Sequence, residues 1–187
     1  MKTAIVTLKS ISPYSQSRYY AGDVPKNDKE SSADYEERTW MYRCHVMPDG
    51  RVFIPPMSFK NCLSEVAKYL AMQIPGKGKS TYTKHFEAGV LVTEPVVLDI
   101  KHDEVRGESF FVPASGKRGD GKRVMKKFPV IPEWSAEVTF YILDETITEE
   151  VFRHHLEQAG KFIGIGRFRP RNNGFYGRFE IAKLKWA

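Results

Sequence analysis

The chain has few of the residues that mark secreted, metal-stabilised or membrane proteins. Among 187 residues there are only two cysteines, Cys44 and Cys62, and no C-x-x-C spacing. We therefore expect neither a zinc finger nor a disulfide scaffold, and we expect an intracellular, cytoplasmic protein. No apolar run is long enough to span a membrane, and residues 1–8 are too short and polar for a signal peptide. We accordingly expect no membrane partner.

Catalytic and metal-binding motifs are also missing. The five histidines form no H-E-x-x-H motif and no recognisable dyad with a serine or cysteine. We therefore expect no resident metal and no cofactor. The composition itself, with 41% hydrophobic and 28% charged residues, is that of an ordinary globular domain. We predict a single domain over residues 1–187.

Positive charge is concentrated in two segments. The net charge is +6, but residues 113–127 alone carry +5 and residues 160–179 carry another +5. Residues 23–37 oppose them with −4. Basic segments of this kind indicate a polyanionic partner.

The pattern of hydrophobic residues predicts a mixed α+β fold. Strands are expected at 2–9, 39–46, 51–54, 88–100, 134–143 and 178–184, and helices at 58–74 and 148–160. A long loop is expected at 10–38, and residues 105–130 are expected to form an inserted β-hairpin arm with a basic tip. This order predicts a ferredoxin-like βαββαβ domain, a modified RNA-recognition motif. Antiparallel sheets of this type often bind single-stranded RNA on their open face.

The stretch 160–179 is the most informative part of the chain. Five glycines permit close approach of another backbone, four arginines suit phosphates, and aromatic rings between them suit stacking on bases. We interpret it as an RNA-binding loop, with Tyr176 as the exposed stacking residue. A helix cap followed by a basic hairpin is the simpler alternative. The candidate residues are Gly164, Gly166, Arg167, Arg169, Arg171, Tyr176 and Gly177.

Two further groups are candidates for RNA contact. Ser58 is expected to cap the helix that follows Pro55-Pro56, and Lys60 would lie in its first turn. A lysine there opposes the helix dipole, and a bound anion would remove that conflict. The tip of the hairpin arm would add diffuse attraction, through Lys117, Arg118, Lys122 and Arg123.

Two of these segments resemble a known family. The segment Ile54-Pro55-Pro56-Met57-Ser58-Phe59-Lys60-Asn61 matches the helix-entry motif Ile-Pro-Gly-Ser-Ser-Leu-Lys-Gly at Ile54, Pro55, Ser58 and Lys60. The glycine-rich loop before the last strand is similar to that of the same family, the RAMP superfamily of CRISPR-associated proteins. The resemblance implies a backbone-type subunit of an effector complex, in compact or phage-encoded form. It would bind single-stranded guide RNA without cutting it, beside other effector subunits or copies of itself.

Two other functions remain open at this point. The chain could be a metal-dependent ribonuclease that uses an aspartate of the first loop, with Asp23, Asp28 and Asp34 as candidates. It could also be a mimic of a backbone subunit that binds or inhibits an effector complex.

Overall fold

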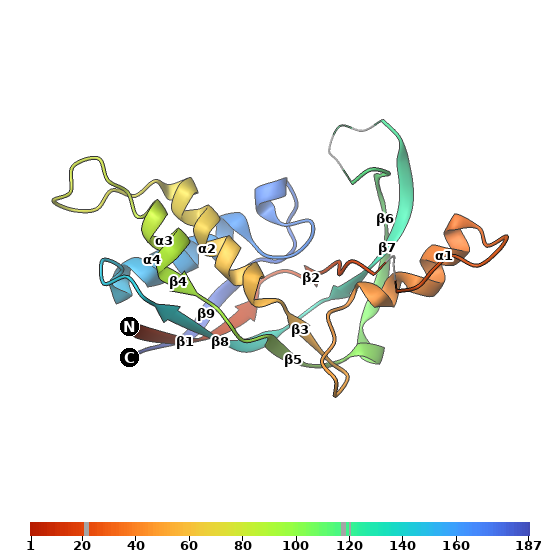
Figure 1. Cartoon of the computed structure of the whole chain (residues 1–187), viewed down its shortest axis with the longest axis horizontal. Coiled ribbons are helices and arrows are strands. Elements are labelled where there is room, and N and C mark those ends of the chain that lie inside the picture. The colour runs from red at the N-terminus through yellow and green to blue at the C-terminus, as the bar shows by residue number, and fades with distance from the viewer. Residues whose placement is uncertain (21–22, 117–118, 120) are drawn as a thin grey trace.

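The structure, a computed structural model that describes residues 1–20, 23–116, 119 and 121–187, contains an antiparallel sheet of four strands. The alternating residues Ala4, Val6 and Leu8 are fully buried on one face of this sheet, which explains why the first strand forms. Both termini lie at the same end of the sheet (Figure 1). In spatial order the strands are β4 (Val90–Leu91), β8 (Ser135–Ile142), β1 (Lys2–Ser10) and β9 (Phe179–Trp186).

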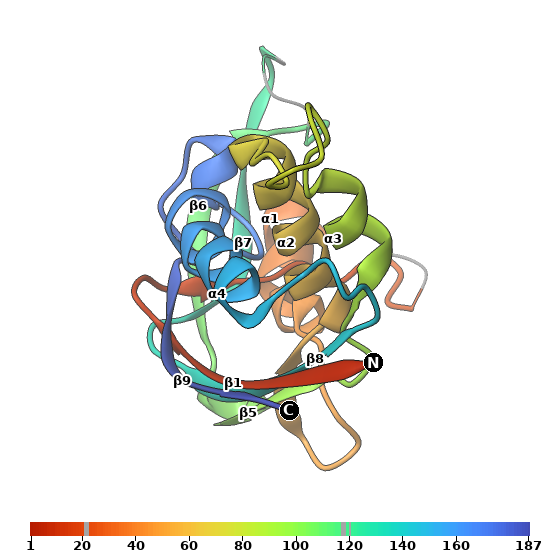
Figure 2. The same cartoon turned by 90° about the vertical axis from the view of Figure 1, so that its left-hand side faces the viewer.

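Three helices cover one face of the sheet and leave the other uncovered (Figure 2). They are α2 (Pro56–Leu70), α3 (Thr83–Gly89) and α4 (Glu149–Gln158). The ring of Phe59 in α2 meets Phe140 of β8 and Phe179 of β9 edge to face, with centroids 6.5 and 5.9 Å away. This aromatic cluster joins the helices to the sheet.

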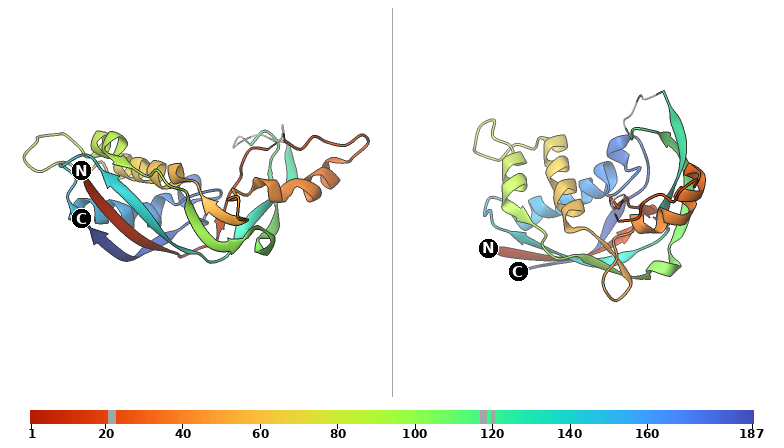
Figure 3. Two further views of the ribbon diagram at one scale, coloured as in Figure 1. Left: turned by 60° about the horizontal axis from the view of Figure 1, so that its bottom comes forward. Right: turned by 45° about the vertical axis from the view of Figure 1, so that its right-hand side comes forward.

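A second unit, which we call the arm, extends away from the termini (Figures 1 and 3). It consists of a three-stranded sheet with helix α1 (Ser32–Thr39) packed against it. The strands of the arm, in spatial order, are β2 (Tyr14–Ser15), β7 (Arg123–Ile131) and β6 (Arg106–Pro113). Between the arm and the main sheet lies a two-stranded ribbon of β3 (Arg51–Ile54) and β5 (Val96–Lys101).

The mixed α+β character with antiparallel sheets is confirmed. The hairpin arm expected at 105–130 is also present, as β6 and β7. Two predictions were wrong in detail. The segment 10–38 is not one long loop, because it contains β2 and most of α1. Helix α3, which has only seven residues, was not predicted from the sequence.

Residues 39–46 were predicted as a strand, and this is wrong. The chain continues from α1 into a 3₁₀ helix, Trp40–Arg43. Helical turns place Arg43 on the same side as Glu36, seven residues earlier, and the two side chains form a largely buried ion pair with N–O distances of 2.8 and 3.1 Å. Both side chains also bond to the backbone of Lys127 in β7, and these tertiary contacts outweigh the alternation that indicated a strand.

Among the described residues no helix is long and apolar enough to cross a membrane.

Candidate nucleic-acid interface

The glycine-rich loop, residues 164–178, is held by backbone hydrogen bonds to the segment that enters β2. The amide of Arg167 donates to Ser15 O at 2.8 Å, and the amide of Gly177 donates to Pro13 O at 2.7 Å. Three glycines of this loop, Gly164, Gly166 and Gly177, have positive φ. A Cβ on Gly166 would overlap Ser15 O and the Tyr14 ring. The loop therefore lies closer to β2 than other residues would allow.

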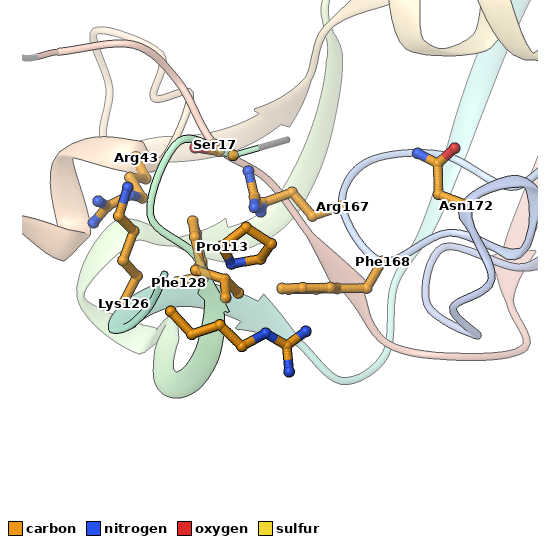
Figure 4. A pocket seen from close by; sticks show the side chains of 11 residues that line it. Ser17, Arg43, Pro113, Lys126, Phe128, Arg167, Phe168 and Asn172 are labelled. Atoms are coloured by element: carbon orange, nitrogen blue, oxygen red, sulfur yellow. The ribbon is translucent and has the colours of Figure 1, made fainter. Parts of the chain in front are cut away.

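A pocket of about 470 Å³ opens between this loop and the arm. It lies beside the arm rather than on the uncovered face of the main sheet. Figure 4 shows Arg43 and Lys126 on one side of the pocket and Arg167 and Phe168 on the other. The pocket is lined by cations and aromatic rings together, with Ser17, Arg43, Val112, Pro113, Gly116, Arg123, Lys126, Phe128, Arg167, Phe168 and Asn172.

Arg167 has an unusual environment. Its guanidinium lies 3.9 Å from the centroid of the Phe128 ring and 5.2 Å from that of Phe168. Its Nε is buried and has no hydrogen-bond partner among the described residues. Burial lowers the pKa of Arg167, and the nearby charge of Arg43 lowers it further. Because an arginine stays protonated, Arg167 carries a fixed positive charge here, and its Nε–H donor is unused.

Arg43, on the other side of the Phe128 ring, differs from Arg167. Its guanidinium lies 5.0 Å from the ring centroid, but its charge is compensated by Glu36. It also donates to Lys127 O at 3.0 Å, and the amide of Lys127 donates to Glu36 at 2.8 Å. Arg43 therefore stabilises the arm, while Arg167 has no carboxylate partner among the described residues.

A second hollow of about 600 Å³ continues the pocket along the arm toward α1. The two hollows share Ser17, Arg43 and Lys126. The second one reaches Arg18, Tyr19, Lys26 and Lys122, so the continuous surface remains rich in cations.

Tyr176 was expected to be an exposed stacking residue, and this expectation of exposure is wrong. Its side chain is only 8% exposed, and its hydroxyl donates to Glu108 at 3.2 Å. Its ring meets Phe110 and Phe168 edge to face. Its neighbour Phe175 is 57% exposed and rests edge-on against it, with centroids 4.7 Å apart. Tyr176 therefore supports the loop from inside.

Ser58 and Lys60 also have roles other than those expected. Pro55 is the N-cap of α2, so Ser58 lies inside the first turn. The ammonium of Lys60 donates to Ser64 Oγ, Phe86 O and Glu87 O, at 2.8, 3.2 and 2.7 Å. An ammonium has three hydrogens, and these acceptors use all of them. The structure therefore places Lys60 as a link between α2 and α3 rather than as a phosphate ligand.

The remaining basic candidates are in different surroundings. Arg169 pairs with Glu65 of α2 at 2.8 Å, and Arg171 is exposed in a 3₁₀ turn. Arg123 and Lys122 each line one of the two hollows. Lys117 and Arg118 lie outside the described residues.

The three candidate aspartates of the first loop are exposed and do not form a site together. Asp23 pairs with Arg18 at 3.1 Å, and Asp34 accepts a hydrogen bond from the N-cap residue Ser31. In the part of the chain that the structure describes, no group of three His, Cys, Asp or Glu side chains is arranged to hold a metal.

Arg43 and Phe128 were not predicted as site residues from the sequence. Arg43 was assigned to a strand, and Phe128 is one aromatic residue among many on the expected hairpin. Only the paired cationic contacts to one ring reveal them, and these contacts join residues far apart in sequence.

No protein-family profile and no curated protein sequence matches this chain. Among solved structures it is similar to a chain of the type III-B Cmr-beta complex bound to cognate target RNA, with a TM-score of 0.53 and 11% identity. That match covers 99% of this chain, which spans 60% of the length of the other. It is also similar to Cmr6 from Pyrococcus furiosus, with a TM-score of 0.50 and 14% identity over 97% of this chain and 98% of that one.

These likenesses define the class of fold. The chain has the fold of RAMP-family subunits of CRISPR complexes, and the resemblance inferred from its motifs is confirmed at that level. More particularly, the first of these structures is a chain of a type III-B Cmr-beta complex and the second is Cmr6.

Proposed function

We propose that this protein binds single-stranded RNA in the pocket between the glycine-rich loop and the arm. The observation that carries the proposal is Arg167, a charge without a carboxylate partner among the described residues, held against Phe128 at 3.9 Å. A planar guanidinium with free donors suits a phosphate, and the ring of Phe168 on the same wall suits a base. Lys126 and Arg123 on the hairpin add attraction for the backbone.

The fold gives this RNA-binding role a context. We propose that the chain acts as a non-catalytic, backbone-type subunit that holds guide RNA in a CRISPR effector complex. The neighbouring Cmr-beta structure, solved with cognate target RNA, supports this context. Other effector subunits, or further copies of this chain, would be its partners.

The finer fold assignment belongs to the same proposal. Strand β1, helix α2, strands β4 and β8, helix α4 and strand β9 would be the βαββαβ elements of a ferredoxin-like domain. The observed order β4-β8-β1-β9 supports this assignment, because β8 lies between β4 and β1. The arm and the ribbon of β3 and β5 would then be insertions into one domain.

The test is a salt titration of binding to a fluorescent single-stranded RNA and to duplex DNA. We expect tighter binding to the RNA, and an affinity that falls steeply with salt because phosphate contacts release counterions. Arg167→Ala should weaken binding roughly tenfold and reduce the salt slope by about 0.7, the value for one phosphate contact on a single strand. Arg167→Lys should recover the slope but only part of the affinity, since it keeps the charge and loses the planar group.

Arg153→Ala is the matched control. Arg153 is an arginine of α4 paired with Glu149 at 3.3 Å, on the helical side of the molecule. It should bind RNA like the parent. Failure of the parent to bind RNA at low salt, or equal binding by Arg167→Ala and Arg153→Ala, would contradict the proposed function.

A further inference from the structure

Two large aromatic side chains form an exposed pair that does not belong to the lining of the pocket. Tyr69 of α2 is 54% exposed and Phe162 is 47% exposed. Their ring centroids are 5.8 Å apart and their planes differ by 32°. Two half-exposed rings in contact, from different elements, present aromatic surface to solvent on which a flat ligand can stack.

A local irregularity of the backbone turns Phe162 outward. After α4 the chain forms a π-helical turn, Ala159–Ile163, in which the amide of Gly164 donates to Ala159 O at 2.9 Å. Ala159 and Ile163 are fully buried, so the turn places Phe162 on the outer side. Such π-turns occur often at functional sites, because the extra residue redirects side chains.

The same glycine-rich loop connects this aromatic pair to the pocket. Glu65 lies one helical turn before Tyr69 on the same face of α2, and Arg169 of the loop pairs with it at 2.8 Å. Figure 1 shows the loop, coloured blue, between α2 and the β6–β7 hairpin. The contact of Arg169 with Glu65 thus places part of the loop against the face of α2 that carries Tyr69.

The charges beside the pair favour a polyanion. Lys161 precedes Phe162, and Arg178 donates through its Nε to Lys161 O at 3.2 Å. Neither has a carboxylate partner among the described residues, whereas Lys68, next to Tyr69, is neutralised by Glu87 at 2.6 Å. The pair therefore lies beside two uncompensated cations.

We infer that Tyr69 and Phe162 form a base-stacking subsite for single-stranded RNA, a second contact on the path that begins at Arg167. This inference rests on the proposed function. Stacking on aromatic faces is tolerant of sequence, because every base has a π-face. Its ligand is thus a base, whereas Arg167 in the pocket is proposed to bind a phosphate.

The experiment compares two ligands of equal length, a single-stranded oligouridylate and an abasic ribose-phosphate oligomer. Tyr69→Ala and Phe162→Ala should each weaken binding of the oligouridylate by about 5- to 150-fold, the range found for loss of one stacked base. They should leave binding of the abasic oligomer and the salt slope unchanged. Tyr69→Phe should behave like the parent, since it keeps the ring.

Leu143→Ala is the control for removal of an exposed apolar side chain, since Leu143 is 48% exposed and lies after β8. All variants should have the same melting temperature as Leu143→Ala. If Leu143→Ala and the aromatic variants bind oligouridylate equally, the stacking inference is wrong, while the proposed function is unaffected. An equal loss for both ligands also overturns it, because the pair would then act on the backbone. If the parent binds no RNA at all, the proposed function fails with it.

Discussion

The ammonium of Lys60 donates to the carbonyl oxygen of Glu87 at 2.7 Å, and this contact ties the N-terminal half of α2 to the C-terminal part of α3. Lys60, which the family motif assigns to RNA contact, thus donates hydrogen bonds to carbonyl groups near the C-terminus of another helix, α3. A cation at a helix C-terminus is favoured by the helix dipole, which explains why this position keeps a lysine without any ligand.

Lys60→Met should therefore affect stability and not RNA binding. Removal of the ammonium leaves Phe86 O and Glu87 O without their donor, and we expect a loss of about 1–3 kcal/mol in the free energy of unfolding. Urea denaturation measures the loss, and anisotropy with single-stranded RNA measures binding. A drop in RNA affinity as large as that of Arg167→Ala, at unchanged stability, would restore Lys60 as an RNA ligand.

Gly166→Ala should destabilise the protein more than an ordinary glycine replacement. Gly166 has φ of +73°, and the added Cβ would overlap Ser15 O and the Tyr14 ring. Strain and overlap together should cost about 2–4 kcal/mol. Gly50→Ala is the control, because Gly50 has φ of +84° and open space around its Cα. Gly50→Ala therefore adds only backbone strain, without overlap, and should cost about 1–2 kcal/mol in stability. Equal melting temperatures for the two variants would show that the loop can move away from β2.

Tyr176→Ala and Tyr176→Phe should separate packing from stacking on RNA. Because the ring is buried against Phe110 and Phe168, Tyr176→Ala should cost about 3–5 kcal/mol in stability. Tyr176→Phe loses only the hydrogen bond to Glu108 and should keep RNA affinity. A folded Tyr176→Phe protein with weakened RNA binding would mean that the hydroxyl contacts RNA directly.

Acid should destabilise the protein through His155. This side chain is fully buried, its ring stacks on Phe86 at 4.2 Å, and burial lowers its pKa to about 4. Between about pH 6.5 and 4 this histidine binds a proton in the unfolded chain, where its pKa is near 6.5, but stays neutral in the folded protein. The contribution of His155 to the free energy of unfolding is therefore fully present above about pH 6.5, and the free energy falls by up to about 3 kcal/mol as the pH drops to 4.

Urea titrations at pH 7.5, 5.5 and 4.5 measure this slope, and two variants assign it. His155→Gln removes the titrating group and should flatten the slope, while the exposed neighbour His154→Gln should keep it. If the slope survives in His155→Gln, another group is responsible.

Asp23→Ala, Asp28→Ala and Asp34→Ala should bind RNA as tightly as the parent or slightly more tightly. Each removes an exposed negative charge near a polyanion, without breaking a buried contact. Magnesium-dependent cutting of RNA that is lost in one of these variants would favour the ribonuclease alternative over the proposed function.

The sequence by itself was enough for the elements with strong periodicity. The alternation in 2–9 predicted β1, the helical spacing after Pro55 predicted α2, and the turn-rich tip between two apolar runs predicted the hairpin of β6 and β7. These patterns are local, since each element has to bury one face. The glycines and arginines of residues 160–179 likewise marked the loop that lines the pocket.

Tertiary structure alone decided which of those side chains are available to a ligand. The segment expected as a strand is helical, and its Arg43 donates to the backbone of Lys127 in β7, while Lys60 donates to carbonyl groups of α3. Tyr176 went inside the loop, while Arg167 was left with free donors over Phe128. Each outcome depends on a partner from elsewhere in the chain. Residue type and spacing carry no information about such contacts, because burial and charge compensation exist only once the arm and the helices have met.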